Sequence, residues 1–282
     1  MMKTIVNEEV IPNNIDFLDR CARVMPISLH VIRAKECQIF AKYKYKRPIL
    51  DIGCGEGEFA KILFDEKIDV GIDINKKNVN KAIKSGAYKK CYVSASENIE
   101  FNEGYFKSII SNCVLEHVSS MEKTLDNVYK ILDDDGIVYF TVATDKFSRY
   151  FSFSDYFYRF ITISEVITRI FDKVFNHNFA VKKPEWDKMF DSAGFEILYD
   201  EPYLSRTQLH IMGIYLIFSF PSFIWKKIFN KWRIFPKFYR NKRFIQYLRN
   251  LNFKECFDGG CHFYKLRKKR KEELKLEKII FT

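Results

Sequence analysis

Apolar runs of strand length alternate with helical patterns through the first half of the chain. Pro48–Ile52 predicts a buried strand, and a glycine-rich turn and a helical pattern follow it. The same alternation continues with predicted strands at Val70–Ile74, Lys90–Ser94, Lys107–Asn112 and Gly136–Val142, a helix ending near Ser85 and a helix at Met121–Leu132. Strands and helices that alternate at this spacing predict an α/β domain with a mostly parallel sheet.

The pattern differs on both sides of this core. A single helical stretch is expected before it, at about Ile15–Tyr43, and an aromatic-rich helical segment after it, at Tyr150–Phe175. Later elements are expected to be a helix in Lys183–Gly194, an antiparallel strand pair at Phe195–Tyr199 and Cys261–Leu266, and a charged helical tail at Arg267–Thr282. The predicted organisation is an N-terminal helical segment (1–46), a core (47–205) with an aromatic cap (146–180), an insertion (206–258), and a last strand with its tail (259–282).

The charge of the chain is concentrated at its C-terminal end. The 282 residues include 47 basic and 36 acidic ones, which gives a formal net charge of +11. From Trp225 onward there are 18 basic and 5 acidic residues, a balance of +13, so residues 1–224 carry −2. A nearly neutral segment of this length argues against a protein that binds nucleic acid along the whole chain.

Cysteine usage and hydropathy indicate a cytoplasmic chain. The seven cysteines include no Cys-x-x-Cys pair and no histidine at metal spacing, which predicts reduced thiols and no metal site. The first fifteen residues lack an apolar stretch of signal-peptide length. The longest apolar run, Ile211–Trp225, would be about 22 Å long as a helix, whereas a hydrocarbon core is about 30 Å thick, so no membrane span is expected.

The turn after the first strand carries the clearest chemistry. Its sequence, DIGCGEGEF from Asp51, has glycines spaced G-x-G-x-G, which lets a ligand approach the backbone. Glu56 and Glu58 would repel a pyrophosphate and suit a cationic ligand. Asp73, near the end of the second strand, stands where a carboxylate commonly accepts hydrogen bonds from ribose hydroxyls. A ribose-bearing cation without phosphates describes S-adenosylmethionine.

These segments resemble the class I S-adenosylmethionine-dependent methyltransferases, in the broad group often labelled type 11. The matching stretches are PILDIGCGEGEFA, VGIDINKKNV, ISNCVLEHV, ILDDDGIVYFTV and, more weakly, DSAGFEI. The resemblance covers about Arg47–Thr144 and implies a Rossmann-like, doubly wound, mostly parallel seven-stranded sheet, with S-adenosylmethionine as methyl donor. The residues expected to bind the donor are Asp51, Gly53, Cys54, Gly55, Gly57, Asp73, Ile74, Ser96, Glu97 and Asn112.

Two positions depart from that family's pattern. Lys107, at the start of the predicted fourth strand, stands where the family usually has Asp. The family usually has an acid, which commonly meets the adenine amine, where this chain has Ala95. Ser94, Ser96 and Glu97 are the candidates to take over that contact.

Methyl transfer from a sulfonium mainly needs alignment and exclusion of water. A hydroxyl acceptor would also need a base, for which His117 and His177 are the candidates, and a structural role stays the alternative for each. Cys54 and Cys113 are expected to pack as small apolar residues rather than to act as nucleophiles.

The insertion suggests a partner. Its apolar stretch HIMGIYLIFSFPSFIW is followed by KKIFNKWRIFPKFYRNKR, which suits a segment in the headgroup layer of an anionic membrane, through residues 211–249. The expected acceptor is then a small molecule or a lipid- or glycan-linked group. Packing of the apolar stretch on the core stays an equal alternative.

An RNA acceptor ranks lower, since no Asn/Asp-Pro-Pro-aromatic motif follows the fourth strand, and a non-catalytic scaffold is the third hypothesis. The oligomeric state stays open.

Overall fold

The computed structural model covers the core of the chain and part of its insertion. It describes residues 8–10, 15–25, 27–152, 154, 165–166, 168–170, 172–173, 177–179, 181–229, 243, 246–247, 249–250 and 256–269. Most of the predicted aromatic segment, most of the basic half of the insertion and residues 270–282 of the predicted tail therefore lie outside the described residues.

Seven strands form one sheet in the order β5-β4-β3-β6-β7-β9-β8. Every neighbouring pair is parallel except the two that involve β9, which runs antiparallel to β7 and β8. This is the predicted seven-stranded, mostly parallel sheet, including the late antiparallel pair. The strands are β3 (Ile49–Ile52), β4 (Ile68–Asp73), β5 (Tyr88–Val93), β6 (Phe106–Asn112), β7 (Leu132–Ala143), β8 (Phe195–Ser205) and β9 (Gly259–Lys268).

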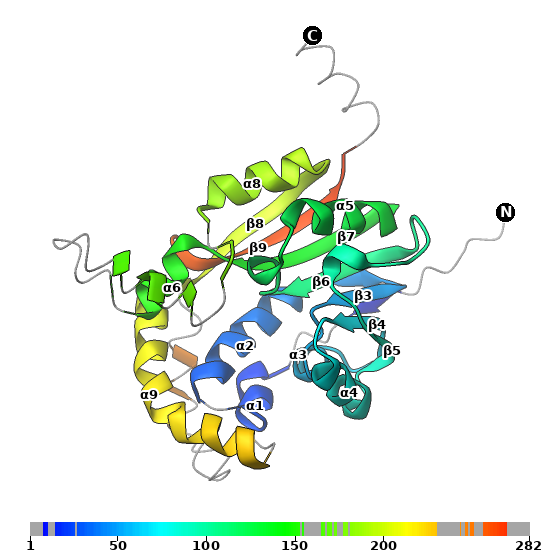
Figure 1. Cartoon of the computed structure of the whole chain (residues 1–282). Coiled ribbons are helices and arrows are strands. Elements are labelled where there is room, and N and C mark those ends of the chain that lie inside the picture. The colour runs from blue at the N-terminus through cyan, green and yellow to red at the C-terminus, as the bar shows by residue number, and fades with distance from the viewer. Residues whose placement is uncertain are drawn as a thin grey trace.

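Helices cover both faces of the sheet (Figure 1). On one face lie α1 (Phe17–Ala22), α2 (Ile27–Phe40), α3 (Glu58–Leu63) and α4 (Lys76–Ser85). On the other face lie α5 (Met121–Ile131) and α8 (Lys183–Ser192). Each layer has its own apolar core, one around Phe40 and Leu63 and the other around Leu125 and Trp186. Two short 3₁₀ turns, η1 (Ser96–Asn98) and η2 (Leu115–His117), follow β5 and β6.

The two ends of the core differ from the sequence predictions. The helical stretch expected at Ile15–Tyr43 consists of two helices, α1 and α2, and the chain then pairs β2 (Lys44–Lys46) with β1 (Glu8–Val10) in a small antiparallel sheet. Arg267 and Lys268 belong to β9 and not to a helical tail, because they pair with Glu196 and Phe195 of β8. The boundaries of the four predicted segments stay a prediction.

Two helices near the carboxyl edge of the sheet belong to the cap and the insertion. The helix α6 (Asp145–Phe151) follows β7, and α9 (Arg206–Phe229) follows β8 and packs against both α2 and α6. Leu209 and Met212, in the first half of α9, are buried, so this half packs on the core. Among the helices that the structure describes, none is both long and apolar enough to cross a bilayer.

The turn between β3 and α3 lies tightly against the loop after β6. Gly53 has a φ of +76°, and a Cβ atom there would lie 2.2 Å from Cγ2 of Val114. A side chain at this position would therefore meet both backbone strain and a steric clash. The turn and the β6 loop can approach this closely only because residue 53 is glycine.

We expect Gly53→Ala to lower the free energy of unfolding by roughly 2 to 4 kcal/mol, because strain and overpacking add. Gly86→Ala is the matched control, because Gly86 has a φ of +74° but a Cβ there would meet nothing within 4 Å. It should cost only about 1 kcal/mol. Urea unfolding without donor measures both, and equal losses in the two variants would contradict the steric account.

Candidate active site

A cavity of about 180 Å³ lies beyond the carboxyl ends of the central strands. Five residues predicted to bind the donor line it: Gly53, Asp73, Ile74, Ser96 and Glu97. Its other lining residues include the predicted His117 and also Ser94, Ala95, Val114, Val118 and Ser119. The carboxyl edge of a parallel sheet is where α/β proteins bind ligands, so this cavity is the candidate donor site.

Asp73 is fixed at the end of β4 by three hydrogen bonds. The amide N–H of Gly55 donates to its Oδ2 at 3.0 Å, and the amide N–H of Asn75 and Nδ2 of Asn78 donate to its Oδ1 at 2.7 and 3.2 Å. Each carboxylate oxygen can accept more than one hydrogen bond, so capacity remains for a hydroxyl donor. A Cβ at Gly55 would meet nothing within 4 Å, so the backbone of the turn is open on that side. Both features fit a bound ribose.

Glu97 is the second carboxylate that lines the cavity. Its Oε1 accepts hydrogen bonds from the amide and hydroxyl of Ser119, at 2.7 and 2.8 Å, and from the amide of Ser120 at 3.1 Å. Burial alone would raise the pKa of Glu97, but these hydrogen bonds outweigh it and lower the pKa to about 2. The wall beside Ala95 therefore carries a permanent negative charge.

Asp51 is not among the residues that line the cavity. It is buried, and its Oδ2 accepts a 2.6 Å hydrogen bond from the hydroxyl of Tyr88. Burial raises the pKa of Asp51 to about 7, and the nearby Asp73 adds to the effect, while the Tyr88 hydrogen bond opposes it. Asp51 therefore supports the turn from the protein interior. Below about pH 7 most of its carboxyl groups are protonated and uncharged.

The remaining residues of the glycine turn hold its shape. The amides of Gly53 and Cys54 both donate to the carbonyl of Ile72, at 2.8 Å, and Cys54 is buried. Gly57, the N-cap residue of α3, has a left-handed conformation. Glu56 pairs with Lys81 at 2.7 Å, and Glu56 and Glu58 line a different cleft, between α1, α3 and α4. Their suggested role in favouring a cationic ligand therefore does not act within the donor cavity.

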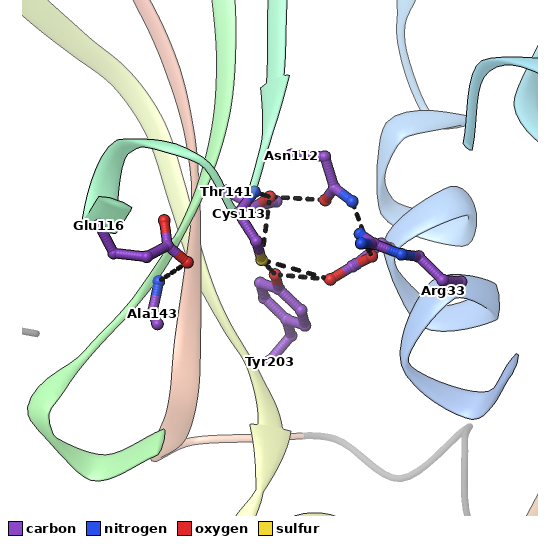
Figure 2. Close-up of polar contacts among 8 residues, drawn as sticks. Arg33, Asn112, Cys113, Glu116, Thr141, Ala143 and Tyr203 are labelled. Atoms are coloured by element: carbon purple, nitrogen blue, oxygen red, sulfur yellow. Dashed lines mark hydrogen bonds and ion pairs between the residues drawn. The ribbon is translucent and has the colours of Figure 1, made fainter. Parts of the chain in front are cut away.

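Asn112 joins β6 to α2 in a buried polar network (Figure 2). Its Nδ2 donates to Oε2 of Glu36 at 2.8 Å, and its Oδ1 accepts from the hydroxyl of Thr141 at 2.7 Å. Glu36 is fully buried and pairs with Arg33 at 2.7 Å. Asn112 thus orients α2 over the site and does not line the cavity. Sequence reasoning missed Arg33 and Glu36, although a charged pair three residues apart in a buried helix was a signal.

Cys113 also belongs to this network, and so the prediction that it packs as an apolar residue is wrong. Its Sγ lies 3.4 Å from Oε1 of Glu36 and 3.4 Å from the hydroxyl of Tyr203 (Figure 2). A hydrogen bond with Cys261 and burial raise the pKa of Cys113 well above its usual range. The side chain therefore stays a thiol, which suits a hydrogen-bonding role and not a nucleophilic one.

The two candidate histidines lie next to each other, although they come from separate segments. The ring centroids of His117 and His177 are 5.2 Å apart. Glu116, the residue before His117, is buried, and burial raises the pKa of its carboxyl. One ligating atom from each of these three residues lies within 4.8 Å of the others. Figure 2 shows Glu116 on the opposite side of the strands from Arg33.

The sheet order, the glycine turn and the carboxylate at the end of β4 together define a class I S-adenosylmethionine-dependent methyltransferase. A family model described as a methyltransferase domain matches residues 30–200, which is more than half of the chain. The chain belongs to this methyltransferase family.

Solved structures share the fold at low sequence identity. One is a protein of Thermotoga maritima described as an S-adenosylmethionine-dependent methyltransferase and possible histamine N-methyltransferase. It is 17% identical, with a TM-score of 0.54 over 86% of this chain and 92% of that one. Another, an S-adenosylmethionine-dependent methyltransferase of Archaeoglobus fulgidus, is 15% identical, with a TM-score of 0.51 over 84% and 93% of the two chains.

Two curated relatives come from Methanocaldococcus jannaschii. The uncharacterized protein MJ1252 is 38% identical over 96 residues, which are 34% of this chain and 36% of that protein. The uncharacterized protein MJ1123 is 28% identical over 106 residues, 38% of this chain and 49% of that protein. The matched regions therefore span less than half of each relative's length.

The raised pKa of Asp51 predicts a pH dependence of stability. An unfolded aspartate titrates near pH 4, whereas the folded pKa is about 7, so the folded state binds more protons between these values. Above pH 7 the buried, charged carboxylate therefore lowers the free energy of unfolding by about 4 kcal/mol, and this penalty disappears as the pH falls to about 4. Asp51→Asn, which is neutral at every pH and can still accept from Tyr88, should gain stability relative to the wild type as the pH rises from 4 to 7. Urea unfolding across this range measures it, and a constant difference would contradict the assignment.

Proposed function

We propose that this protein transfers a methyl group from S-adenosylmethionine to a small-molecule or lipid- or glycan-linked acceptor at an anionic membrane surface. The observation that carries the donor half of this proposal is the cavity at the carboxyl edge of the sheet, where Asp73 is held by the backbone of the glycine turn. The carboxylate would accept from the ribose hydroxyls, and Ile74, Val114 and Val118 would flank the adenine.

Local acids support a donor that carries positive charge. Glu97 keeps its charge at neutral pH because its pKa is about 2, and it faces the same cavity as Asp73. A sulfonium donor gains attraction from such carboxylates, whereas a phosphate-bearing ligand would be repelled. The site therefore favours S-adenosylmethionine over a dinucleotide.

His117 and His177 lie on the side of the cavity where an acceptor would enter between the β6 turn and the cap. His117 lines the donor cavity, and the side chain of His177 is 5% exposed beside it. We place the acceptor next to this pair, where an imidazole could take the proton of a hydroxyl. If His117→Ala and His177→Ala both kept the wild-type rate at saturating donor, this role would be excluded.

The second half of α9 supports the membrane part of the proposal. Ile224, Ile228 and Phe229 are 48%, 66% and 53% exposed, whereas Leu209 and Met212 at the start of the helix are buried. The sequence from Trp225 onward carries the +13 charge. Exposed apolar side chains beside a basic segment suit the headgroup layer of an anionic bilayer.

Incorporation of labelled methyl groups tests the acceptor class. Purified protein and methyl-labelled donor are incubated with separate lipid, glycan and RNA fractions of a cell extract. The proposal expects donor-dependent label in the lipid or glycan fraction or in a small molecule. Label confined to RNA would overturn the acceptor assignment and favour the basic segment as a nucleic-acid surface.

We expect the protein to float with vesicles containing anionic lipid at low salt, and to dissociate as salt screens the charges. Ile228→Glu should weaken this binding at least tenfold, because it places a charge on the apolar face of α9. Ile83→Glu is the matched control, since Ile83 is 57% exposed on α4, far along the chain from α9. Binding to neutral vesicles alone, or equal losses in both variants, would exclude the anionic-surface proposal.

A further inference from the structure

Glu116, His117 and His177 form a compact cluster of metal-ligating side chains beside the donor cavity. One ligating atom from each lies within 4.8 Å of the others, and His117 also lines the cavity. We propose that this cluster binds a single divalent transition-metal ion. Sequence spacing predicted no metal site, because His177 lies far from the Glu-His pair along the chain.

The carboxylate of Glu116 is the strongest sign of a cation. The residue is 1% exposed, and its Oε1 accepts a 3.2 Å hydrogen bond from the amide of Ala143. Its Oε2 is buried and has no hydrogen-bond partner among the described residues. A buried carboxylate oxygen costs free energy unless a donor or a cation compensates for its lost hydration. A metal ion between this oxygen and the imidazoles would supply that compensation.

The two segments that supply the ligands are joined by hydrogen bonds. The amides of Asn178 and Phe179 donate to the carbonyl of Glu116 at 2.7 and 3.0 Å. The side-chain amide of Asn178 donates to the carbonyls of His117 and Val118 at 3.0 and 3.2 Å. The two residues that follow His177 therefore hold its segment against η2 with four hydrogen bonds, and none of these bonds involves the imidazole, as a preorganised ligand requires.

An outer carboxylate supports the imidazole of His177. Oδ1 of Asp172 lies 3.5 Å from Nδ1 of this ring, and the hydroxyl of Ser148 donates to the same oxygen. Metal-binding histidines commonly contact a carboxylate through their second nitrogen, which fixes the ring and its tautomer. Asp172 is placed for that role.

The donor set favours particular ions. Two imidazoles and one carboxylate suit Zn²⁺, Co²⁺ or Mn²⁺ better than Mg²⁺, which prefers oxygen ligands alone. Metal bonds of about 2.1 Å allow ligand atoms to lie up to about 4.2 Å apart. The observed limit of 4.8 Å thus needs only small side-chain rotations to close around an ion.

Such an ion would determine the acceptor chemistry, a consequence that rests on the proposed function. A metal bound beside the donor would hold a hydroxyl oxygen of the acceptor and favour release of its proton to solvent. That oxygen would form the new bond to the methyl carbon, and the sulfur–methyl bond would break with its electron pair left on sulfur. The imidazole nitrogens that bind the ion could not also accept the proton, so this role would replace a histidine base.

Metal titration without donor or acceptor tests the site directly. Chelator-treated, tag-free full-length protein is titrated with Zn²⁺ by calorimetry and with Co²⁺ by visible absorption. We expect one equivalent to bind, with a Co²⁺ spectrum that shows nitrogen ligation. His177→Gln and Glu116→Gln should each weaken binding at least tenfold.

His210→Gln is the matched control, because His210 is also buried but lies on α9, outside the cluster. It should bind metal like the wild type. Circular dichroism checks that each variant is folded. If Glu116→Gln does not fold, the metal affinity of His177→Gln alone decides the test. Absence of stoichiometric binding, or equal affinity in the wild type and His177→Gln, would overturn the proposal. Because no methyl transfer is measured, this outcome is independent of whether the proposed function holds.

Discussion

The close contact between Gly53 and Val114 fixes the geometry on which the rest of the site depends. It brings the glycine turn after β3 against the loop after β6, and a Cβ at residue 53 would have to occupy the space of the Val114 side chain. The candidate donor cavity lies where these two segments meet, with Gly53 and Val114 in its wall. A site built on the ends of rigid strands keeps its groups in position better than a site carried by long loops.

The short segment from Asn112 to His117 then connects this contact to the rest of the molecule. Asn112 and Cys113 enter the buried network with Glu36, which ties α2 to the sheet. Glu116 lies on the other side of the strands (Figure 2), and Asn178 and Phe179 of the cap are hydrogen-bonded to the same turn. One loop therefore contacts the candidate donor cavity, α2 and the cap. A substitution that shifts this loop should disturb all three together.

The sequence was enough to predict those parts of the site whose residues lie close together along the chain. The glycine turn and Asp73 lie within short stretches that each carry their own pattern, and so their positions could be predicted. The resemblance to the family implied that Asn112 binds the donor, but only the packing of α2 shows that its amide binds Glu36. The cluster of Glu116 with His177 was equally hidden, because tertiary contacts and not spacing bring the cap to η2. The sequence of the apolar run Ile211–Trp225 does not distinguish its two ends, yet packing on the core buries Met212 and leaves Ile224 exposed.

Calorimetric titration with S-adenosylmethionine tests the central claim, that the cavity at the carboxyl edge of the sheet binds the methyl donor through Asp73. The account predicts saturable one-to-one binding, and a loss of at least tenfold in affinity for Asp73→Asn, equivalent to about 1.4 kcal/mol. Asp126→Asn, at an exposed acid on α5, serves as the control and should bind like the wild type. Absence of donor binding to the folded wild type, or unchanged affinity in Asp73→Asn, would contradict the account.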